Sequence, residues 1–182
     1  MSNFKEIKSA EFPYTPFDLK DKWMLVTAEK DGKVNTMTAS WGGMGIMWNK
    51  NVVFVVIRPQ RYTKEFIDRA DSFSLTFFES SFKKQLGYLG KVSGRDENKI
   101  EKAGLTILHE GKVPYFEEAE IVITANKLFS SPWNETNFID KSIVDRWYPE
   151  KDFHTLYIAE ISKMLKNEHT IFKDKDLDNI LL

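Results

Sequence analysis

The chain has 182 residues, of which 42% are hydrophobic and 14% aromatic, so we expect one folded domain of residues 1–182 with its own core. Its 26 basic and 27 acidic residues give a formal net charge of −1, which argues against nucleic acid or an acidic membrane as partner. The absence of cysteine excludes disulfides, thiol catalysis and cysteine-ligated metals, and it fits a cytoplasmic protein.

The first predicted element is a β-hairpin. Residues 23–29 and 34–41 are rich in β-favouring side chains, and Asp31-Gly32 between them is a strong two-residue turn signal. The glycine-rich residues 42–45 indicate a loop. The β-branched run 52–57 predicts a central strand buried on both faces. This longest apolar run is far shorter than a bilayer requires, so we expect a soluble chain without a membrane segment.

A short helix and another strand follow this run. Residues 62–70 place apolar side chains on one helical face, with Thr63 positioned to cap the helix and Glu65 in its first turn. Residues 72–78 alternate aromatic or aliphatic with hydroxyl side chains, which predicts a half-buried strand.

The second half of the chain predicts further strands around one long polar excursion. The expected elements are helices at 82–89 and 98–103, an extended piece at 105–108, strands at 119–129 and 155–164, a helical turn at Lys141–Trp147 within the excursion 130–152, and a C-terminal arm over about 165–182, strongly charged from Lys173. Strands joined by tight turns outnumber helices. We therefore expect a mainly β fold with short helices, an antiparallel β-barrel of the α+β kind rather than a doubly wound sheet.

Several catalytic signatures are missing from the sequence. The segment Gly43-Met44-Gly45 continues to Trp48 where a dinucleotide fingerprint requires glycine, and Gly111-Lys112 lacks the spacing and hydroxyl of a P-loop. The three histidines have no metal-ligand spacing, and no Gly-x-Ser-x-Gly elbow is present. We therefore expect no metal site and no hydrolase chemistry.

One basic cluster stands where a predicted strand ends and a predicted helix begins. Its members are Arg58, Arg61, Tyr62, Thr63 and Lys64. Helix N-termini offer free N–H groups, and arginine binds phosphate with two parallel hydrogen bonds, so this cluster favours a phosphate site. The alternative is a solvated basic loop that pairs with Glu65 and Asp68.

Two further segments are candidates for ligand contact. Residues 35–41 form a strand dense in small hydroxyl side chains beside glycines, where a flat ring could lie against the backbone. β-propensity alone explains the same pattern as a half-exposed strand. Residues 90–96 form a glycine- and serine-containing turn with charges, and the alternative there is a plain surface loop.

In this order these segments resemble the flavin reductase-like family, whose fold is the FMN-binding split barrel. The resemblance covers about residues 17–161 and is carried by residues 35–41 with their Met-Thr-Ala-Ser-Trp core, 58–63, 73–77, 93–96 followed by Lys99, and 153–161. The sequence departs from the family in two places. Phe153 stands where family members often have an acidic residue before the histidine, and residues 130–147 match no family pattern.

The resemblance implies an FMN held non-covalently between the subunits of a homodimer. It places the phosphate near Arg58, Arg61 and Thr63, and the edge of the ring against the backbone of residues 36–40. The further cofactor-binding candidates that it implies are Asn35, Thr36, Met37, Thr38, Ala39, Ser40, Trp41, Tyr62, Lys64, Ser93, Gly94 and Lys99. His154 is the candidate catalytic residue beside a nicotinamide, and the alternative is a histidine that opens a strand and bonds a backbone carbonyl.

Two functions compete on this basis. The first is an NAD(P)H:flavin oxidoreductase that uses NADH or NADPH and passes electrons to free flavin, oxygen or an electron-accepting protein. The second is a flavoredoxin-like electron carrier without a nicotinamide site, and a barrel that has lost flavin is a third alternative. The flavin itself carries the chemistry of hydride transfer, so neither function needs a nucleophilic side chain. A cavity open over the flavin, rather than one covered by residues 130–147 or by the C-terminal tail, would favour the first.

Overall fold

A computed structural model gives the structure of residues 3–169. Its strands are β1 (Phe4–Ile7), β2 (Met24–Lys30), β3 (Lys33–Ala39), β4 (Gly42–Met47), β5 (Lys50–Ile57), β6 (Ser72–Phe77), β7 (Ile107–Glu110), β8 (Val113–Phe116), β9 (Ile121–Pro132) and β10 (Thr155–Asn167). Its α-helices are α1 (Leu19–Lys22), α2 (Tyr62–Arg69), α3 (Lys83–Lys91), α4 (Lys99–Lys102) and α5 (Lys141–Trp147). Single 3-10 turns are η1 (Ser9–Glu11), η2 (Pro16–Asp18), η3 (Ser80–Phe82) and η4 (Glu135–Asn137).

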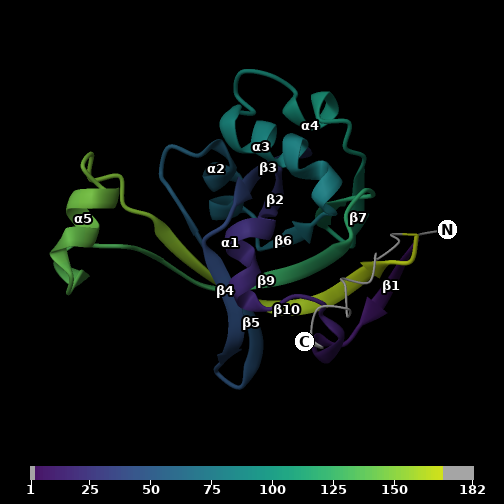
Figure 1. Cartoon of the computed structure of the whole chain (residues 1–182), viewed down its shortest axis with the longest axis horizontal. Helices are drawn as coiled ribbons and strands as arrows, with labels where there is room; N and C mark the ends of the chain where they lie inside the picture. The colour runs from purple at the N-terminus through teal and green to yellow at the C-terminus, as the bar shows by residue number, and fades with distance from the viewer. Residues whose placement is uncertain (1–2, 170–182) are drawn as a thin grey trace, which may run out of the picture.

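The strands form one large antiparallel sheet that curls into a split barrel (Figure 1). The strand order is β3-β2-β6-β9-β10-β5-β4, and β7 and β8 form a separate pair. One edge of β10 pairs along its first half with β5 and along its last four residues with β1, while the other edge pairs with β9. The order ends at β3 and β4, which the chain joins through Ser40 and Trp41, so these two residues lie at the seam of the barrel.

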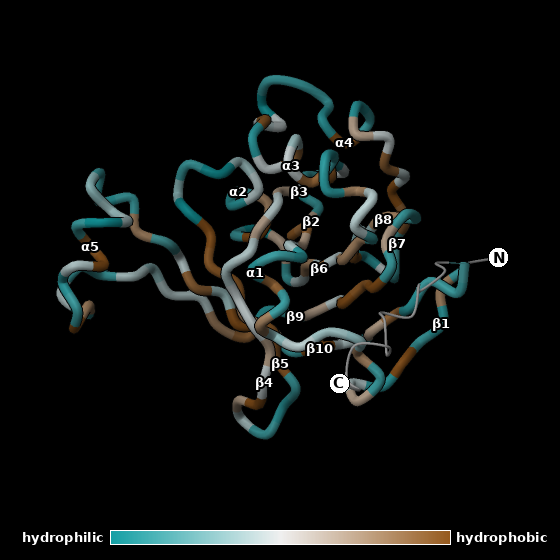
Figure 2. Tube along the Cα trace, in the orientation of Figure 1, coloured by the Kyte–Doolittle hydropathy of each residue, from teal (hydrophilic) through white to brown (hydrophobic). Residues whose placement is uncertain are grey.

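The core lies inside this barrel and under the helices at one end. Large side chains with 0–1% exposure, such as Met24, Phe73 and Tyr157, fill the barrel. A second cluster, which includes Leu25 of β2 and Leu86 and Leu89 of α3, packs α3 against the β2–β3 hairpin. Figure 2 shows the corresponding distribution, with hydrophobic residues concentrated along the strands and hydrophilic residues on the helices and turns.

The predicted hairpin is confirmed. β2 and β3 pair over their full lengths, and the turn residues Asp31 and Gly32 have φ values of 50° and 72°. Two successive positive φ values give a turn whose twist matches that of the strands it joins. The turn between β4 and β5 has the same form at Trp48 and Asn49, although neither residue is glycine.

The prediction of a loop at residues 42–45 is wrong, because they begin β4. A Cβ on Gly43 would lie 2.6 Å from the Phe54 ring, and one on Gly42 would lie 2.5 Å from the Phe54 carbonyl oxygen. These glycines therefore permit the close pairing of β4 with β5. The prediction that β6 is half-buried is also wrong, because the strand is buried on both faces from Phe73 to Phe77. β8 covers the face that carries the hydroxyl side chains, and Ser74 Oγ donates a hydrogen bond to Pro114 O at 2.5 Å.

Two other predictions fail at the ends of elements. The N-cap of α2 is Arg61 rather than Thr63, and the Thr63 hydroxyl lies within the first turn and accepts a hydrogen bond from Asn35. β10 runs to Asn167, so residues 165–167 belong to the sheet rather than to an arm. The charged segment from Lys173 lies outside the described residues. No local sequence pattern predicts β1 or β8.

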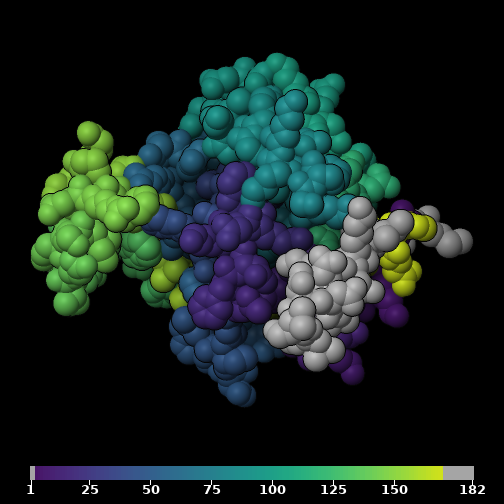
Figure 3. Space-filling view, viewed as in Figure 1, coloured from purple at the N-terminus to yellow at the C-terminus, as the bar shows by residue number. Residues whose placement is uncertain are grey.

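Residues 133–153 leave the sheet between β9 and β10 and carry η4 and α5. We call this segment the excursion. The prediction placed the start of this segment at residue 130, but residues 130–132 pair with β10 and extend β9. Figure 1 shows it projecting from the barrel, and in Figure 3 it forms a separate lobe. Within residues 3–169, no helix has the length and apolar character needed to cross a membrane.

Candidate functional site

Two adjoining cavities open at the barrel seam, between the end of β3 and the start of α2. The first has a volume of about 170 Å³ and is lined by Met37, Thr38, Ala39, Ser40, Trp41, Val56, Arg58, Arg61, Trp147 and His154. The second, of about 160 Å³, is lined by Met37, Gln60, Arg61, Tyr62, Thr63, Lys91, Val92, Ser93 and Lys99. Since Met37 and Arg61 line both cavities, we treat them as one site with two compartments.

The second compartment is lined by the exposed Lys91 and by two less exposed cations, Arg61 and Lys99, which have no carboxylate partner among the described residues. Lys99 is 4% exposed, and its ammonium donates to the carbonyls of Leu89 and Val92 at 2.8 and 2.9 Å. Arg61 donates to the carbonyl of Gly90 at 2.7 Å. Among residues 3–169, no Asp or Glu forms an ion pair with either cation. Burial, and then the charge of Arg61, lowers the pKa of Lys99 to about 8.

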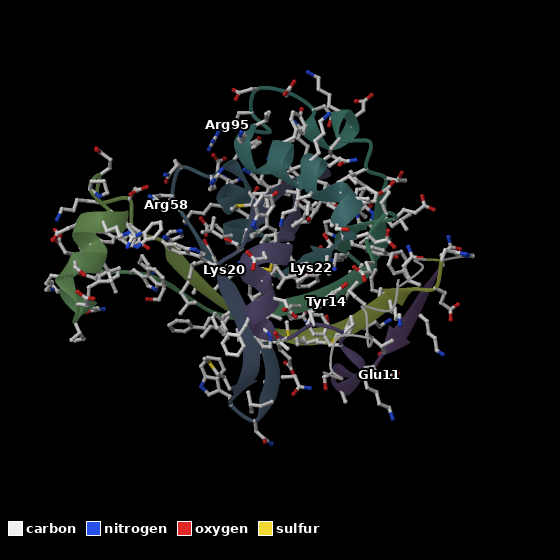
Figure 4. The ribbon with its side chains drawn as sticks, viewed as in Figure 1. Glu11, Tyr14, Lys20, Lys22, Arg58 and Arg95 are labelled. Carbon is white, nitrogen blue, oxygen red and sulfur yellow. The ribbon has the colours of Figure 1, made fainter. Side chains whose placement is uncertain are left out.

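The loop of residues 93–96 is held against α2 by Arg95. Its guanidinium lies 4.5 Å from the centre of the Tyr62 ring and pairs with Glu65 at 2.5 Å. Figure 4 labels Arg95 near the top of the view. Ser93, whose hydroxyl accepts a hydrogen bond from the Arg95 backbone N–H, lines the second compartment together with Arg61. Hydroxyls of Ser93 and Thr63 therefore accompany the two cations. A cavity with this set of donors at a helix N-terminus is suited to an anion such as a phosphate monoester.

The first compartment is bounded by aromatic rings. Trp41 lies with its ring centre 5.2 Å from those of His154 and Trp147. His154 is 7% exposed, and its Nδ1 forms a 2.7 Å hydrogen bond with the Tyr148 hydroxyl. Burial and the nearby charge of Arg58 lower the pKa of His154 to about 4, so the imidazole is neutral at pH 7. The partner of His154 is thus a phenol rather than the backbone carbonyl of the sequence-based alternative.

Arg58 differs from Arg61 in having a carboxylate partner. Its Nη1 pairs with Asp152 Oδ2, and its Nη2 donates to the carbonyl of Trp147 at 2.9 Å. The charge of Arg58 is therefore compensated by the excursion, whereas that of Arg61 is free for a ligand.

Comparison with known families agrees with this geometry. A family model described as the flavin reductase like domain matches residues 19–176, which is most of the chain. This chain belongs to the flavin reductase-like domain family. No curated protein sequence matches it.

Solved structures share the fold of this flavin reductase-like chain at low sequence identity. The FMN-binding domain of a flavin reductases-like enzyme from Shewanella baltica is 18% identical, with a TM-score of 0.66 over 91% of this chain and 78% of that one. Flavoredoxin from Methanosarcina acetivorans is 21% identical, with a TM-score of 0.62 over 90% and 75%. The flavin reductase of styrene monooxygenase from Pseudomonas putida is 17% identical, with a TM-score of 0.60 over 81% and 80%.

Most of the candidate residues of this flavin reductase-like chain line the two compartments, but four do not. Asn35 and Thr36 are buried, and Thr36 bonds to Thr27 within the hairpin. Gly94 does not line either compartment and packs against Asn35, so that an added Cβ would lie 2.3 Å from Asn35 Oδ1. Lys64 pairs with Asp68 on the surface of α2, as the solvated-loop alternative predicts.

The structure adds one residue that the sequence did not single out. Trp147 reaches the first compartment from α5, and its distance in sequence from β3 left no local signal for this role. Lys91 and Val92, which belong to the candidate segment 90–96, line the second compartment from the end of α3. Within residues 3–169, no group of His, Asp and Glu is arranged to hold a metal ion.

Proposed function

We propose that this chain is an FMN-binding oxidoreductase that passes electrons from NADH or NADPH to flavin. The observation that carries the proposal is the pair of unpaired cations, Arg61 and Lys99, in one cavity with the hydroxyls of Ser93 and Thr63. A buried ammonium beside a half-buried guanidinium without a carboxylate is unfavourable, so the arrangement calls for an anionic ligand. Membership of the flavin reductase-like family supports the choice of FMN.

The residues present fit the two ends of FMN. Arg61 and Lys99 would hold the phosphate, and the edge of β3 that has no neighbouring strand offers backbone donors and acceptors to the ring at Thr38–Ser40. When bound, FMN would supply the hydride-accepting chemistry that the side chains lack. The protein contributes binding, orientation and the exclusion of water.

The nicotinamide would enter the first compartment beside Trp41 and His154. Because the pKa of His154 is about 4, this side chain would orient the ring through packing and hydrogen bonding rather than through proton transfer at pH 7. The second candidate function is the electron carrier without a nicotinamide site. It is favoured by Trp147, which contacts Trp41 and narrows this compartment from the side of the excursion.

Structures with the same fold include both kinds of protein. They range from an NADH:FAD oxidoreductase of Streptomyces globisporus to the flavoredoxins of Methanosarcina acetivorans and Desulfovibrio vulgaris. The choice between the two functions therefore requires an experiment on this chain. We also propose that the chain forms a homodimer and that its electrons go to free flavin, oxygen or an electron-accepting protein.

The test is anaerobic reduction of the FMN-loaded protein. We expect NADH or NADPH to bleach the absorbance of the bound flavin within seconds, since typical enzymes turn over at about 1 to 1,000 per second. Bleaching by dithionite but by neither nicotinamide over minutes would favour the carrier. Failure to bind FMN, while the protein remains folded, would contradict both functions.

A matched substitution tests the phosphate contact itself. Arg61→Gln removes a charge-assisted contact of about 1.5–3 kcal/mol, so FMN affinity should fall about 10- to 100-fold. Riboflavin, which lacks the phosphate, should bind the variant about as well as it binds the unaltered protein. Equal losses for both ligands would show that Arg61 supports the fold rather than the phosphate.

A further inference from the structure

Arg58 directs its polar contacts to the excursion rather than into the site. Its Nη1 pairs with Asp152 Oδ2, and its Nη2 donates to the carbonyl of Trp147, the last residue of α5. Its guanidinium also lies 5.2 Å from the centre of the Tyr148 ring. Cations stabilise helix C-termini by bonding their free carbonyls. Figure 4 shows Arg58 on the side of the barrel that faces α5.

Asp152 is held by contacts from two residues, Arg58 and Gln60. Its carboxylate side chain is 19% exposed, and Oδ2 also accepts a 2.8 Å hydrogen bond from Gln60. Its Oδ1 is buried and has no hydrogen-bond partner among the described residues. Hydrogen bonds from Gln60 and Arg58 hold the pKa of Asp152 below its usual value. A largely buried carboxylate of this kind is costly once its cation is removed.

The residues between these contacts build one wall of the first compartment. Trp147 packs edge-on against Trp41, and the Tyr148 hydroxyl bonds His154 Nδ1. The Trp147–Trp41 contact and the Tyr148–His154 hydrogen bond therefore both depend on the position of the excursion. The rest of the excursion projects from the barrel (Figure 1).

We propose that Arg58 and Asp152 form a latch that positions the excursion over the first compartment. Arg58 is a positioning residue in this arrangement, and Arg61 and Lys99 are left to bind the anion. This differs from the sequence-based expectation, which placed the phosphate near Arg58. The part of the proposal that concerns phosphate rests on the proposed function, while the positioning of the excursion does not.

The first measurement uses the cofactor-free protein and limited digestion with trypsin. Cleavage sites after Lys141, Arg146 and Lys151 lie in the excursion and are exposed. We expect Arg58→Gln and Asp152→Asn each to accelerate cleavage there about 10- to 100-fold, the factor that corresponds to a charge-assisted contact. The double variant should be cleaved no faster than the faster single variant, because both substitutions open the same latch. Arg58→Lys keeps the charge and should restore most of the protection.

The second measurement compares the affinities of each variant for FMN and riboflavin. We expect both latch variants to keep the ratio of the two affinities near its unaltered value, whereas Arg61→Gln, the matched control, should reduce it. A loss confined to FMN in Arg58→Gln and absent in Asp152→Asn would overturn the latch and return Arg58 to the phosphate. Unchanged cleavage in both variants would also overturn it.

Digestion also distinguishes local opening from a general loss of structure. Cleavage confined to residues 141–151, with thermal unfolding still cooperative, supports the latch. If Arg58→Gln is cleaved throughout the chain, the result for Asp152→Asn decides between a local latch and a general loss of structure, because this substitution replaces a single side-chain oxygen. Cleavage throughout the chain in Asp152→Asn as well would overturn a local latch. Failure of the protein to bind FMN would contradict the proposed function and leave the digestion result valid.

Discussion

Lys99 carries its charge where its surroundings oppose it. Burial and the guanidinium of Arg61 lower its pKa from 10.5 to about 8, and two backbone carbonyls hold the ammonium in place. Between pH 8 and 10.5 the unfolded chain binds more protons than the folded protein. The free protein should therefore gain stability from this group as the pH rises through that window. A bound phosphate favours the charged form of Lys99 and therefore opposes the lowering of its pKa.

This coupling predicts a pH dependence of FMN affinity. Phosphate binding requires charged Lys99, which is half present at pH 8, predominates at pH 7 and is the minor form at pH 9, so affinity should fall by up to about 10-fold between pH 7 and pH 9. The phosphate of FMN is largely a dianion throughout that range and adds little to the slope. Affinity measured by fluorescence titration at several pH values is the check. Lys99→Met should weaken FMN binding and flatten the profile.

Lys102→Met is the control for this prediction. Lys102 lies on the same helix but is exposed and pairs with Glu97, so its substitution should leave the slope intact. Riboflavin affinity should not vary with pH in any of these proteins. A riboflavin profile that falls like that of FMN would count against Lys99 as the phosphate contact.

At the residue scale, the sequence predicted the types of side chain in the site better than their partners. The cluster of Arg58 and Arg61 and the hydroxyl-rich strand were visible as local patterns, and most of these residues line the cavities. The different roles of Arg58 and Arg61 were not visible as a local pattern, because Asp152, the partner of Arg58, is 94 residues away in sequence. Local patterns carry no information about a pair that only the fold brings together.

At the scale of single elements, the β2–β3 hairpin depends on its turn. Gly32 has a φ of 72°, and an added Cβ there would meet nothing within 4 Å, so any cost of substitution is backbone strain. Gly32→Ala should destabilise the protein by about 1 kcal/mol and lower Tm by about 2–4 °C. Thermal unfolding followed by circular dichroism measures this change.

Gly45→Ala provides the comparison. Gly45 lies in β4, its backbone is not left-handed, and an added Cβ there is equally free of contacts. Its substitution should be neutral or slightly stabilising, since alanine loses less backbone freedom on folding. A larger loss for Gly45→Ala than for Gly32→Ala would refute the explanation by backbone strain.

Elements with strong local signals were predicted, and those defined by tertiary contacts were not. The dipeptide Asp31-Gly32 predicts the turn between β2 and β3, and the apolar run 52–57 predicts β5. β4 was missed because its glycines indicate a loop, and the ring of Phe54 that requires them comes from the neighbouring strand. The turn of Trp48 and Asn49 was missed for the related reason that a positive φ is unusual for a tryptophan.

At the scale of the whole molecule, apolar surface gathers on the side of the barrel that carries β4, β5 and β9. Ile46 and Trp48 are 69% and 60% exposed, and Phe129 is 43% exposed with its ring centre 6.5 Å from that of Trp48. We call these three residues the outer apolar patch. Beside it lies a cavity of about 350 Å³, lined almost entirely by apolar side chains that include Met47 and Trp41. Apolar surface gathered in this way is typical of a protein interface.

The homodimer proposed above would cover the outer apolar patch. Trp41 lines both the 350 Å³ cavity beside this patch and the first compartment of the site, so dimerisation and flavin binding should be linked. We expect the protein to sediment as a dimer at micromolar concentration, and Trp48→Glu or Phe129→Glu to shift it towards monomer and weaken FMN binding together. Ile107→Glu is the control, since Ile107 is 38% exposed but lies on β7 in the separate two-stranded sheet, and it should leave the dimer intact. Unaltered protein that sediments as a monomer with flavin bound would contradict the dimer, and monomeric variants that keep full FMN affinity would contradict the linkage.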